Sequence, residues 1–199
     1  MSKTLEFIFD FASPNAYLAH KALPPILERT GAQLQVQPCL LGGIFKATGN
    51  QAPMIAFGGV QGKMQYEQLE MQRFIKKHKL TKFQMNPHFP VNTLLLMRGA
   101  IAAEMDGQLD EYVAAGLKNM WEDGLKMDDS EVYVQAMNKA GFNGQQLLER
   151  TQDQQVKDKL MANTTAAVSR GCFGIPTFFA GDEMFFGKDR LDQIEELLG

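Results

Sequence analysis

The chain has few cysteines and no pairing pattern between them. Its 199 residues include two cysteines, Cys39 and Cys172, which lie far apart and form no C-x-x-C motif. Two thiols without neighbouring histidines make a poor zinc site, and a disulfide between them is not expected in a reducing compartment. The three histidines, His20, His78 and His88, also lack ligand spacing such as H-E-x-x-H. The sequence therefore predicts no metal site.

The chain also lacks an excess of positive charge and a long apolar run. It has 20 lysines and arginines against 23 aspartates and glutamates, which gives a formal net charge of −3 at pH 7. This balance argues against nucleic acid or an anionic membrane as a partner. No run of about 18 apolar residues occurs, so no membrane span is expected. The N-terminal residues MSKTLEFIFDF carry charges and lack a signal-peptide pattern, which predicts a cytoplasmic protein.

The most informative segment is FIFDFASPNAYLA, in which an apolar strand runs directly into a helix. Ser13 and Pro14 stand at the start of that helix, where proline presets the backbone angle φ. A helix N-terminus has unpaired N–H groups and a partial positive charge, so it favours an anion. The Ser13 hydroxyl is therefore a candidate catalytic group, although serine before proline is also an ordinary helix cap.

A strand, a helix and a second strand open the chain. Thr4 to Phe11 is rich in phenylalanine and isoleucine, and Gln33 to Leu41 alternates polar and apolar residues, as strands do. Between them, Ala16 to Arg29 has helical periodicity, with Pro24 and Pro25 predicting a kink or break. Because a helix connects the two strands, we expect them to run parallel.

The middle of the chain is predicted to be a loop followed by helices. Gly42 to Gln61 is rich in glycine, asparagine and proline, which predicts a long loop. Helical periodicity then returns, and Asp128, Asp129 and Ser130 are candidates to cap one of these helices. The predicted helices are Met64 to Lys77, Val91 to Asp106, Asp110 to Asp123, Ser130 to Ala140 and Gly144 to Arg170.

The C-terminal part returns to strands. Pro176 to Ala180 and Met184 to Phe186 are short aromatic runs around a Gly181-Asp182 turn, which predicts a hairpin. A helix from about Lys188 to Leu198 is expected to follow. The order βαβ, helices, ββα predicts an α/β fold with a four-stranded mixed sheet and an all-helical insertion.

Five separated motifs are FDFASPNAYLA, ATGNQAP, FPVNTLLLMRGA, RGCFGIPTFF and FFGKDRLDQIEELL. In this order they resemble the 2-hydroxychromene-2-carboxylate isomerases and the kappa-class glutathione transferases, in the DsbA-like branch of the thioredoxin-like superfamily. The likeness covers nearly the whole chain. It implies a thioredoxin-like domain of residues 1–62 and 171–199, interrupted by a helical insertion domain of residues 63–170.

The resemblance implies that glutathione, as a cofactor, supplies the reactive thiol. Redox members of the superfamily carry C-x-x-C after the first strand, whereas this chain has Ser13, Pro14, Asn15 and Ala16 there. A hydroxyl cannot exchange disulfides. The resembling families place a serine at this position, so Ser13 is expected to stabilise the glutathione thiolate. Asn15 and Ala16 replace an aromatic and a small hydroxyl residue frequent in the family, which leaves the substrate open.

The resemblance also predicts how glutathione is held. A cis bond before Pro176 would turn the backbone of Ile175 outward toward the cysteinyl part of glutathione. At the start of the last helix, backbone amides suit the γ-glutamyl carboxylate and Asp189 suits its ammonium group. A trans proline and a simple helix cap are the plain alternatives. The predicted glutathione-binding residues are Asn50, Ile175, Pro176, Phe186, Gly187, Lys188 and Asp189.

The acceptor substrate is expected to lie near the start of the insertion. Phe45, Lys63, Tyr66 and Asn92 are the predicted substrate-binding residues, and Lys63 would suit a carboxylate. A structural role stays open for each of them. Cys172 precedes the expected cis proline and is expected to be inert, although an exposed thiol there would form a mixed disulfide with glutathione.

Three functions fit these residues. In a glutathione-dependent isomerase, the thiolate adds to a conjugated aromatic substrate and leaves again. In a kappa-class-like transferase or peroxidase, it attacks an electrophile and is consumed. In a non-catalytic protein, the fold binds glutathione or a peptide without chemistry. The isomerase is the preferred interpretation, with a small aromatic or electrophilic substrate and, from the resemblance alone, a homodimer.

Overall fold

A mixed four-stranded sheet organises the structure, a computed structural model that describes residues 3–199. The strand order is β2-β1-β3-β4, with β2 parallel to β1 and with β3 antiparallel to both β1 and β4. This arrangement confirms the predicted sheet, and Gly181 makes the turn of the hairpin with a positive φ of 61°. The strands are β1 (Thr4–Phe9), β2 (Gln33–Pro38), β3 (Thr177–Ala180) and β4 (Glu183–Phe186).

The central strand β1 carries the core of the sheet. Phe7 pairs with Val36 on one side and with Phe178 on the other, and the rings of Phe7 and Phe178 stack with centroids 4.8 Å apart. Phe9 and Phe11 continue the apolar run, and both are fully buried. Burying aromatic side chains at this density fixes the end of β1, from which the following turn and helix begin.

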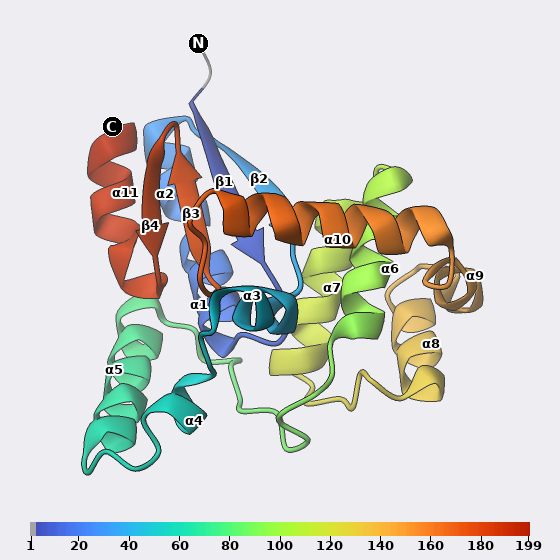
Figure 1. Cartoon of the computed structure of the whole chain (residues 1–199), viewed down its shortest axis with the longest axis horizontal. Helices are drawn as coiled ribbons and strands as arrows, with labels where there is room; N and C mark the ends of the chain where they lie inside the picture. The colour runs from blue at the N-terminus through green and yellow to red at the C-terminus, as the bar shows by residue number, and fades with distance from the viewer. Residues whose placement is uncertain (1–2) are drawn as a thin grey trace.

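Two helices follow β1, and the predicted proline break separates them. These are α1 (Pro14–Ala22) and α2 (Pro24–Thr30), separated by Leu23. The C-terminal helix α11 (Leu191–Leu198) follows a short 3₁₀ turn, η1 (Lys188–Arg190), which takes the place of the predicted first helical turn. Figure 1 shows α1 and α2 behind the strands and a long helix crossing in front of them.

The predicted helices between β2 and β3 are present, with one correction. The predicted helix from Gly144 to Arg170 is two helices, because the chain turns at Thr151 to Asp153 and restarts. Asp129 accepts hydrogen bonds from two backbone N–H groups of α8, which confirms one predicted cap. The helices are α5 (Lys63–His78), α6 (Leu94–Met105), α7 (Leu109–Trp121), α8 (Ser130–Lys139), α9 (Gly144–Arg150) and α10 (Gln154–Ser169). The division into two domains stays a prediction.

The predicted loop from Gly42 to Gln61 is wrong. The structure has α3 (Leu41–Thr48) and a single turn, α4 (Pro53–Ala56), in this segment. The first N–H of α3, at Leu41, donates to the carboxylate of Asp10 over 2.7 Å. The helix therefore starts here because Asp10, which is distant in sequence, accepts a hydrogen bond from its first N–H group. The local composition contains no residue that could do this.

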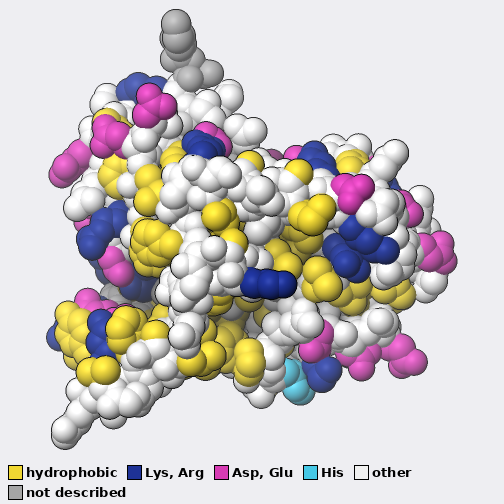
Figure 2. Space-filling view, viewed as in Figure 1, with side chains coloured by type: hydrophobic (Ala, Val, Ile, Leu, Met, Phe, Trp, Pro, Cys, Tyr) yellow, Lys and Arg dark blue, Asp and Glu magenta, His cyan; other side chains and the backbone are white. Residues whose placement is uncertain are grey.

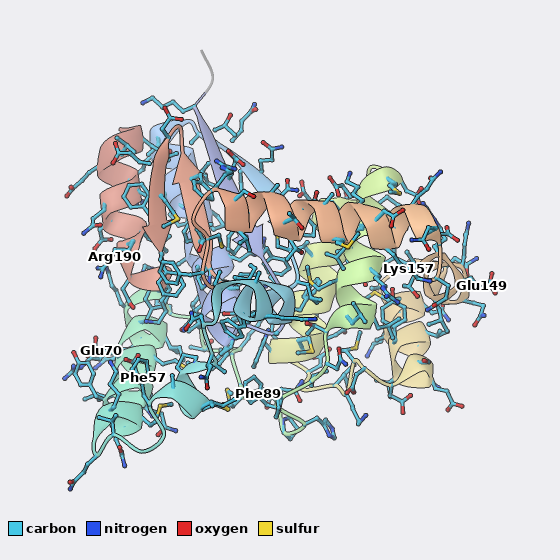
Figure 3. All side chains as sticks on the ribbon, viewed as in Figure 1. Phe57, Glu70, Phe89, Glu149, Lys157 and Arg190 are labelled. Atoms are coloured by element: carbon cyan, nitrogen blue, oxygen red, sulfur yellow. The ribbon has the colours of Figure 1, made fainter. Side chains whose placement is uncertain are left out.

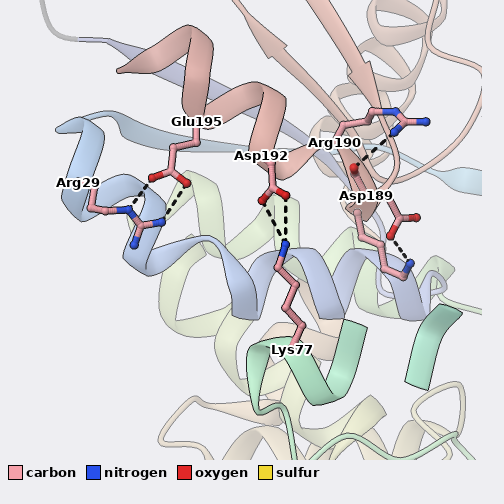
Figure 4. A network of polar contacts seen from close by, with 7 residues as sticks. Arg29, Lys77, Asp189, Arg190, Asp192 and Glu195 are labelled. Carbon is pink, nitrogen blue, oxygen red and sulfur yellow. Dashed lines mark hydrogen bonds and ion pairs between the residues drawn. The ribbon is translucent and has the colours of Figure 1, made fainter. Parts of the chain in front are cut away.

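Helix α5 projects from the body and is tied back to α11. The Lys77 ammonium pairs with Asp192 over 3.1 Å, as Figure 4 shows, and the Lys188 ammonium lies 5.0 Å from the centroid of the Phe74 ring. Figure 1 places α4 and α5 together at the lower left. Among residues 3–199, no helix has both the length and the apolar character that a membrane span needs. Met1 and Ser2, which begin the segment interpreted as lacking a signal peptide, lie outside the described residues.

Candidate active site

Ser13 occupies the N-cap of α1, directly after the turn that follows β1. Its backbone is extended, and its Oγ accepts a hydrogen bond from the N–H of Ala16 over 3.2 Å. The side chain is only 5% exposed. The hydroxyl therefore sits at the positive end of α1 in a site with little water, where a hydrogen bond to an anion is strong.

The loop before β3 faces this hydroxyl. The Ile175–Pro176 bond is cis, as the family resemblance implies, and the Ser13 hydroxyl donates to the carbonyl oxygen of Ile175 over 3.0 Å. No acceptor among residues 3–199 takes the N–H of Ile175. Because a backbone N–H needs a partner, this group is available to a bound molecule beside Ser13.

Asn50 and Phe186 both contact the segment just before the cis proline. The Asn50 amide donates to the carbonyl oxygen of Phe173 over 2.8 Å, and the rings of Phe173 and Phe186 lie with centroids 4.5 Å apart. Glycine is required at position 174, because an added Cβ would lie 2.9 Å from the Phe186 ring. The aromatic pair is exposed, at 39% for Phe173 and 42% for Phe186. Sequence reasoning missed Phe173, although it lies within the RGCFGIPTFF motif.

Lys188 and Asp189 line a pocket between α5 and α11. Gly187 turns the chain with a φ of 95° and donates its N–H to the Pro176 carbonyl over 2.9 Å, which joins this segment to the cis-proline loop. The buried Lys188 ammonium pairs with the exposed Asp189 carboxylate over 2.6 Å. The pocket has a volume of about 290 Å³ and is lined by Glu70, Arg73, Phe74, Lys77, His78, Lys188, Asp189, Leu191 and Asp192. Both signs of charge are present, as a zwitterion requires.

The predicted substrate residues lie further apart from one another than the residues around the cis-proline loop. Lys63 pairs with Glu67 one helical turn away over 2.6 Å, and its ammonium lies 5.6 Å from the Phe57 ring. Tyr66 is exposed on α5, Phe45 is half-buried on α3, and the Asn92 side chain accepts from the N–H of Leu94. Their described hydrogen bonds are local, so their substrate role stays a prediction.

Figure 3 labels Phe57 and Glu70 on the projecting part formed by α4 and α5. In Figure 2, hydrophobic side chains gather over this region of the surface. Met54, Ile55, Phe57 and Val60 are all exposed there. An apolar wall therefore lies on the projection that carries Lys63.

Both cysteines are sealed from solvent. Cys39 and Cys172 are free thiols with no exposed surface, and the Cys172 thiol donates to the carbonyl oxygen of Gly174 over 3.2 Å. A mixed disulfide between Cys172 and glutathione would need an exposed thiol, and Cys172 is not exposed. Burial also raises the pKa of the Cys39 thiol, which keeps it protonated.

Asp10 is a further group at this site, and sequence reasoning gave it no role. It is fully buried three residues before Ser13, and its backbone carbonyl accepts from the Ser13 N–H over 3.3 Å. A single charge within the apolar run FIFDF was the available signal.

Comparison with known proteins gives relatives that match along the whole chain. The 2-hydroxychromene-2-carboxylate isomerase of Sphingobium xenophagum is 28% identical over 200 residues, which cover 100% of this chain and 99% of that protein. Glutathione S-transferase kappa 1 of Rattus norvegicus is 29% identical over 206 residues, which cover 99% and 91%. Both relatives are named as enzymes.

Solved structures agree with these relatives. That of a 2-hydroxychromene-2-carboxylate isomerase superposes with a TM-score of 0.82 at 26% identity, covering 98% of this chain and 94% of the other. Pseudomonas aeruginosa DsbA shares the fold alone, with a TM-score of 0.58 at 13% identity and coverage of 99% and 82%. The DSBA-like thioredoxin domain matches residues 4–199. The chain has a thioredoxin-like fold and belongs to the DSBA-like thioredoxin domain family.

Proposed function

We propose that this protein is a glutathione-dependent isomerase similar to 2-hydroxychromene-2-carboxylate isomerase, acting on a small conjugated aromatic substrate. The observation that carries the proposal is the Ser13 hydroxyl, held at the N-terminus of α1 and 3.0 Å from the Ile175 carbonyl oxygen. Bound glutathione would supply the thiolate that adds to the substrate and leaves again. Relatives with this name match the chain over its whole length.

Ser13 has to change its hydrogen bond to act on a sulfur. A hydroxyl carries one hydrogen, and here that hydrogen goes to the Ile175 carbonyl oxygen. An N–H of the bound peptide can donate to the same carbonyl oxygen, while the free N–H of Ile175 donates to the peptide. The Ser13 hydroxyl is then released to donate to the thiolate.

The stabilisation available at Ser13 is large enough to ionise a bound thiol near neutral pH. A free thiol has a pKa of about 8.5, and each unit of depression needs about 1.4 kcal/mol of preferential stabilisation of the thiolate. A charge-assisted hydrogen bond from Ser13 and the positive end of α1 together contribute roughly 2–3 kcal/mol. We therefore expect the pKa of the bound thiol to fall by about 1.5–2 units, which leaves about half or more of it ionised at pH 7.

The residues at the far end of the site fit the rest of glutathione. The γ-glutamyl group carries a carboxylate and an ammonium, and the pocket beside Asp189 presents both charge signs. Asp189 is 60% exposed, so a bound ammonium can replace its contact with Lys188. The exposed rings of Phe173 and Phe186 support an aromatic substrate, because planar rings stack on them favourably.

Ultraviolet titration of bound glutathione tests the role of Ser13. In the wild type, we expect thiolate absorbance to appear with a pKa about 1.5–2 units below that of free glutathione. In Ser13→Ala, the pKa should rise by about 1 unit, because one charge-assisted hydrogen bond is lost. Ser169→Ala is the matched control, since Ser169 lies at the exposed end of α10.

The same titration separates the alternatives. An unchanged thiol pKa in Ser13→Ala would favour a non-catalytic glutathione- or peptide-binding protein. Absence of glutathione binding would overturn the proposal altogether.

A transferase or peroxidase is the second candidate, because a kappa-class glutathione transferase is a similarly close relative. Incubation with a hydroxychromene carboxylate and with a chloro-nitroaromatic compound separates the two. An isomerase returns all of its glutathione, whereas a transferase consumes one molecule for each product.

A cytosolic location and a homodimer complete the proposal. Glutathione keeps thiols reduced in the cytosol, and both cysteines of this chain are free. The exposed apolar side chains of the α4–α5 projection support association with a second copy.

A further inference from the structure

Asp10 is the most deeply buried carboxylate near Ser13, and both of its oxygens are used. Oδ1 accepts from the Ala12 N–H over 2.9 Å and from the Thr93 hydroxyl over 2.6 Å. Oδ2 accepts from the Leu41 N–H over 2.7 Å. With three donors and no exposed surface, the carboxylate is an internal anchor and not a surface charge.

The three donors belong to three different parts of the site. Ala12 lies in the turn that leads into Ser13, Leu41 is the first residue of α3, and Thr93 is the N-cap of α6. Helix α3 carries the predicted substrate residue Phe45, and Asn92 precedes Thr93. One side chain therefore joins the catalytic turn to both segments that approach the substrate.

Among residues 3–199, no charged side chain donates to the buried carboxylate. The titratable group that faces it is the Cys39 thiol, whose raised pKa keeps it neutral. Burial raises the pKa of Asp10 to about 6, although the hydrogen bonds from Thr93, Ala12 and Leu41 act in the opposite direction. Asp10 therefore changes its charge within the weakly acidic range.

We propose that Asp10 is a positioning residue that holds the Ser13 turn, α3 and α6 together, and that uptake of a proton by its carboxylate loosens this junction. The proposal rests on the proposed role of Ser13.

The physical reason is the number of acceptors. An ionised carboxylate can accept all three hydrogen bonds, whereas a protonated one carries a hydrogen that competes for the same space as a donor. At least one of the three N–H or O–H groups then loses its best acceptor. Because these donors are buried, a lost hydrogen bond is not replaced by water. The backbone of the Ser13 turn is then held less firmly.

The only tryptophan of the chain reports on this turn. The Trp121 indole donates to the carbonyl oxygen of Phe11 over 3.0 Å, one residue from Asp10. Its fluorescence therefore follows the position of the turn without any bound molecule.

A pH titration of Trp121 fluorescence tests the proposal. In the wild type, we expect an inflection near pH 6. In Asp10→Asn the inflection should be lost, because the side chain no longer titrates. In Thr93→Val it should remain but move up by about 0.5–1 pH unit, because a hydrogen bond that stabilises the ionised form is removed.

His88→Gln is the control for an inflection that comes from a group other than Asp10. His88 precedes Phe89, whose ring lies 6.1 Å from that of Trp121. An inflection that is absent from the wild type, that persists in Asp10→Asn, or that disappears in His88→Gln overturns the proposal.

Activity then shows whether the junction positions Ser13. We expect the acidic limb of kcat/KM near pH 6 to move with the fluorescence inflection in Thr93→Val. A limb that stays in place would mean that Asp10 has only a structural role. If glutathione does not bind at any pH, the proposed function fails, but the fluorescence result still decides whether Asp10 controls the turn.

Discussion

Asp10, which is fully buried, and His20, which is half-buried, are ionisable residues whose pKa values are displaced in opposite directions. Burial raises the pKa of Asp10 from 3.8 to about 6, and burial lowers the pKa of His20 from 6.5 to about 4. Between pH 4 and 6, the folded protein binds more protons at Asp10 and fewer at His20 than the unfolded chain. As pH rises through this interval, Asp10 therefore lowers the free energy of unfolding and His20 raises it.

Single variants should expose these two opposing contributions. We expect the wild type to change little in stability between pH 4 and 6, because each contribution changes by about 2 kcal/mol over this interval and the two are of opposite sign. In His20→Gln, the free energy of unfolding should fall by about 2 kcal/mol over this interval. In Asp10→Asn, it should rise by a similar amount. Urea denaturation at several pH values measures both, and curves parallel to that of the wild type would contradict the pKa displacements.

At this scale the sequence singled out Ser13, and the family resemblance predicted the cis proline, because both lie in short motifs. The partners of Asp10 could not be predicted in this way. Leu41 is 31 residues away and Thr93 is 83 residues away, so no local pattern joins them. The individual roles of the predicted site residues stay predictions until they are tested.

Among the elements, α7 packs closely against the turn that leads into Ser13. A Cβ added at Gly116 would lie 2.4 Å from the Phe11 ring, which is fully buried. Phe11 lies between Asp10 and Ser13 in sequence, so the position of α7 fixes the turn. Only glycine permits this approach.

Gly116→Ala should therefore destabilise the protein by about 1–3 kcal/mol through overpacking, and it should weaken glutathione binding by displacing Phe11. Gly42→Ala is the matched control on α3, where nothing lies within 4 Å of the added Cβ. That change should be neutral or stabilise by about 0.5–1 kcal/mol, because alanine favours the helix. Chemical denaturation compares the two variants, and equal effects would argue against the close approach.

The strands and most helices were predictable because their periodicity is local. Helix α3 was missed because its sequence, LGGIFKAT, contains two glycines and no capping side chain. Its start is satisfied by Asp10, and Gly43 is small because the Thr164 side chain lies 3.1 Å from its added Cβ. Both reasons are tertiary contacts, which composition alone does not contain.

At the scale of the whole molecule, the α4–α5 projection gives one face a group of exposed apolar side chains. Its exposed apolar side chains favour burial against a second copy, and the family resemblance implies a homodimer. We expect light scattering after size-exclusion chromatography to give twice the chain mass of 22.2 kDa.

Ile55→Asp combined with Val60→Asp should shift this mass to that of the monomer, because a buried unpaired charge is costly. Met161→Asp is the control, since Met161 is equally exposed on α10, away from the projection. A wild-type monomer, or a dimer that the double variant leaves intact, would contradict this interface.

The order of elements was enough to predict a four-stranded mixed sheet with a helical insertion, because a βαβ unit, a helical block and a ββα unit leave few topologies. The thioredoxin-like assignment came from the family resemblance. The placement of the projection could not be predicted. It depends on Lys77 meeting Asp192 and on Lys188 lying over Phe74, and these partners are distant in sequence.

The sealed thiols make the protein convenient for site-specific labelling. Because Cys39 and Cys172 have no exposed surface, a single cysteine introduced on the α4–α5 projection would be the one thiol within reach of a maleimide. A spin label or fluorophore can therefore be attached to the native background, without first replacing either cysteine, to follow the mobility and surroundings of the projection.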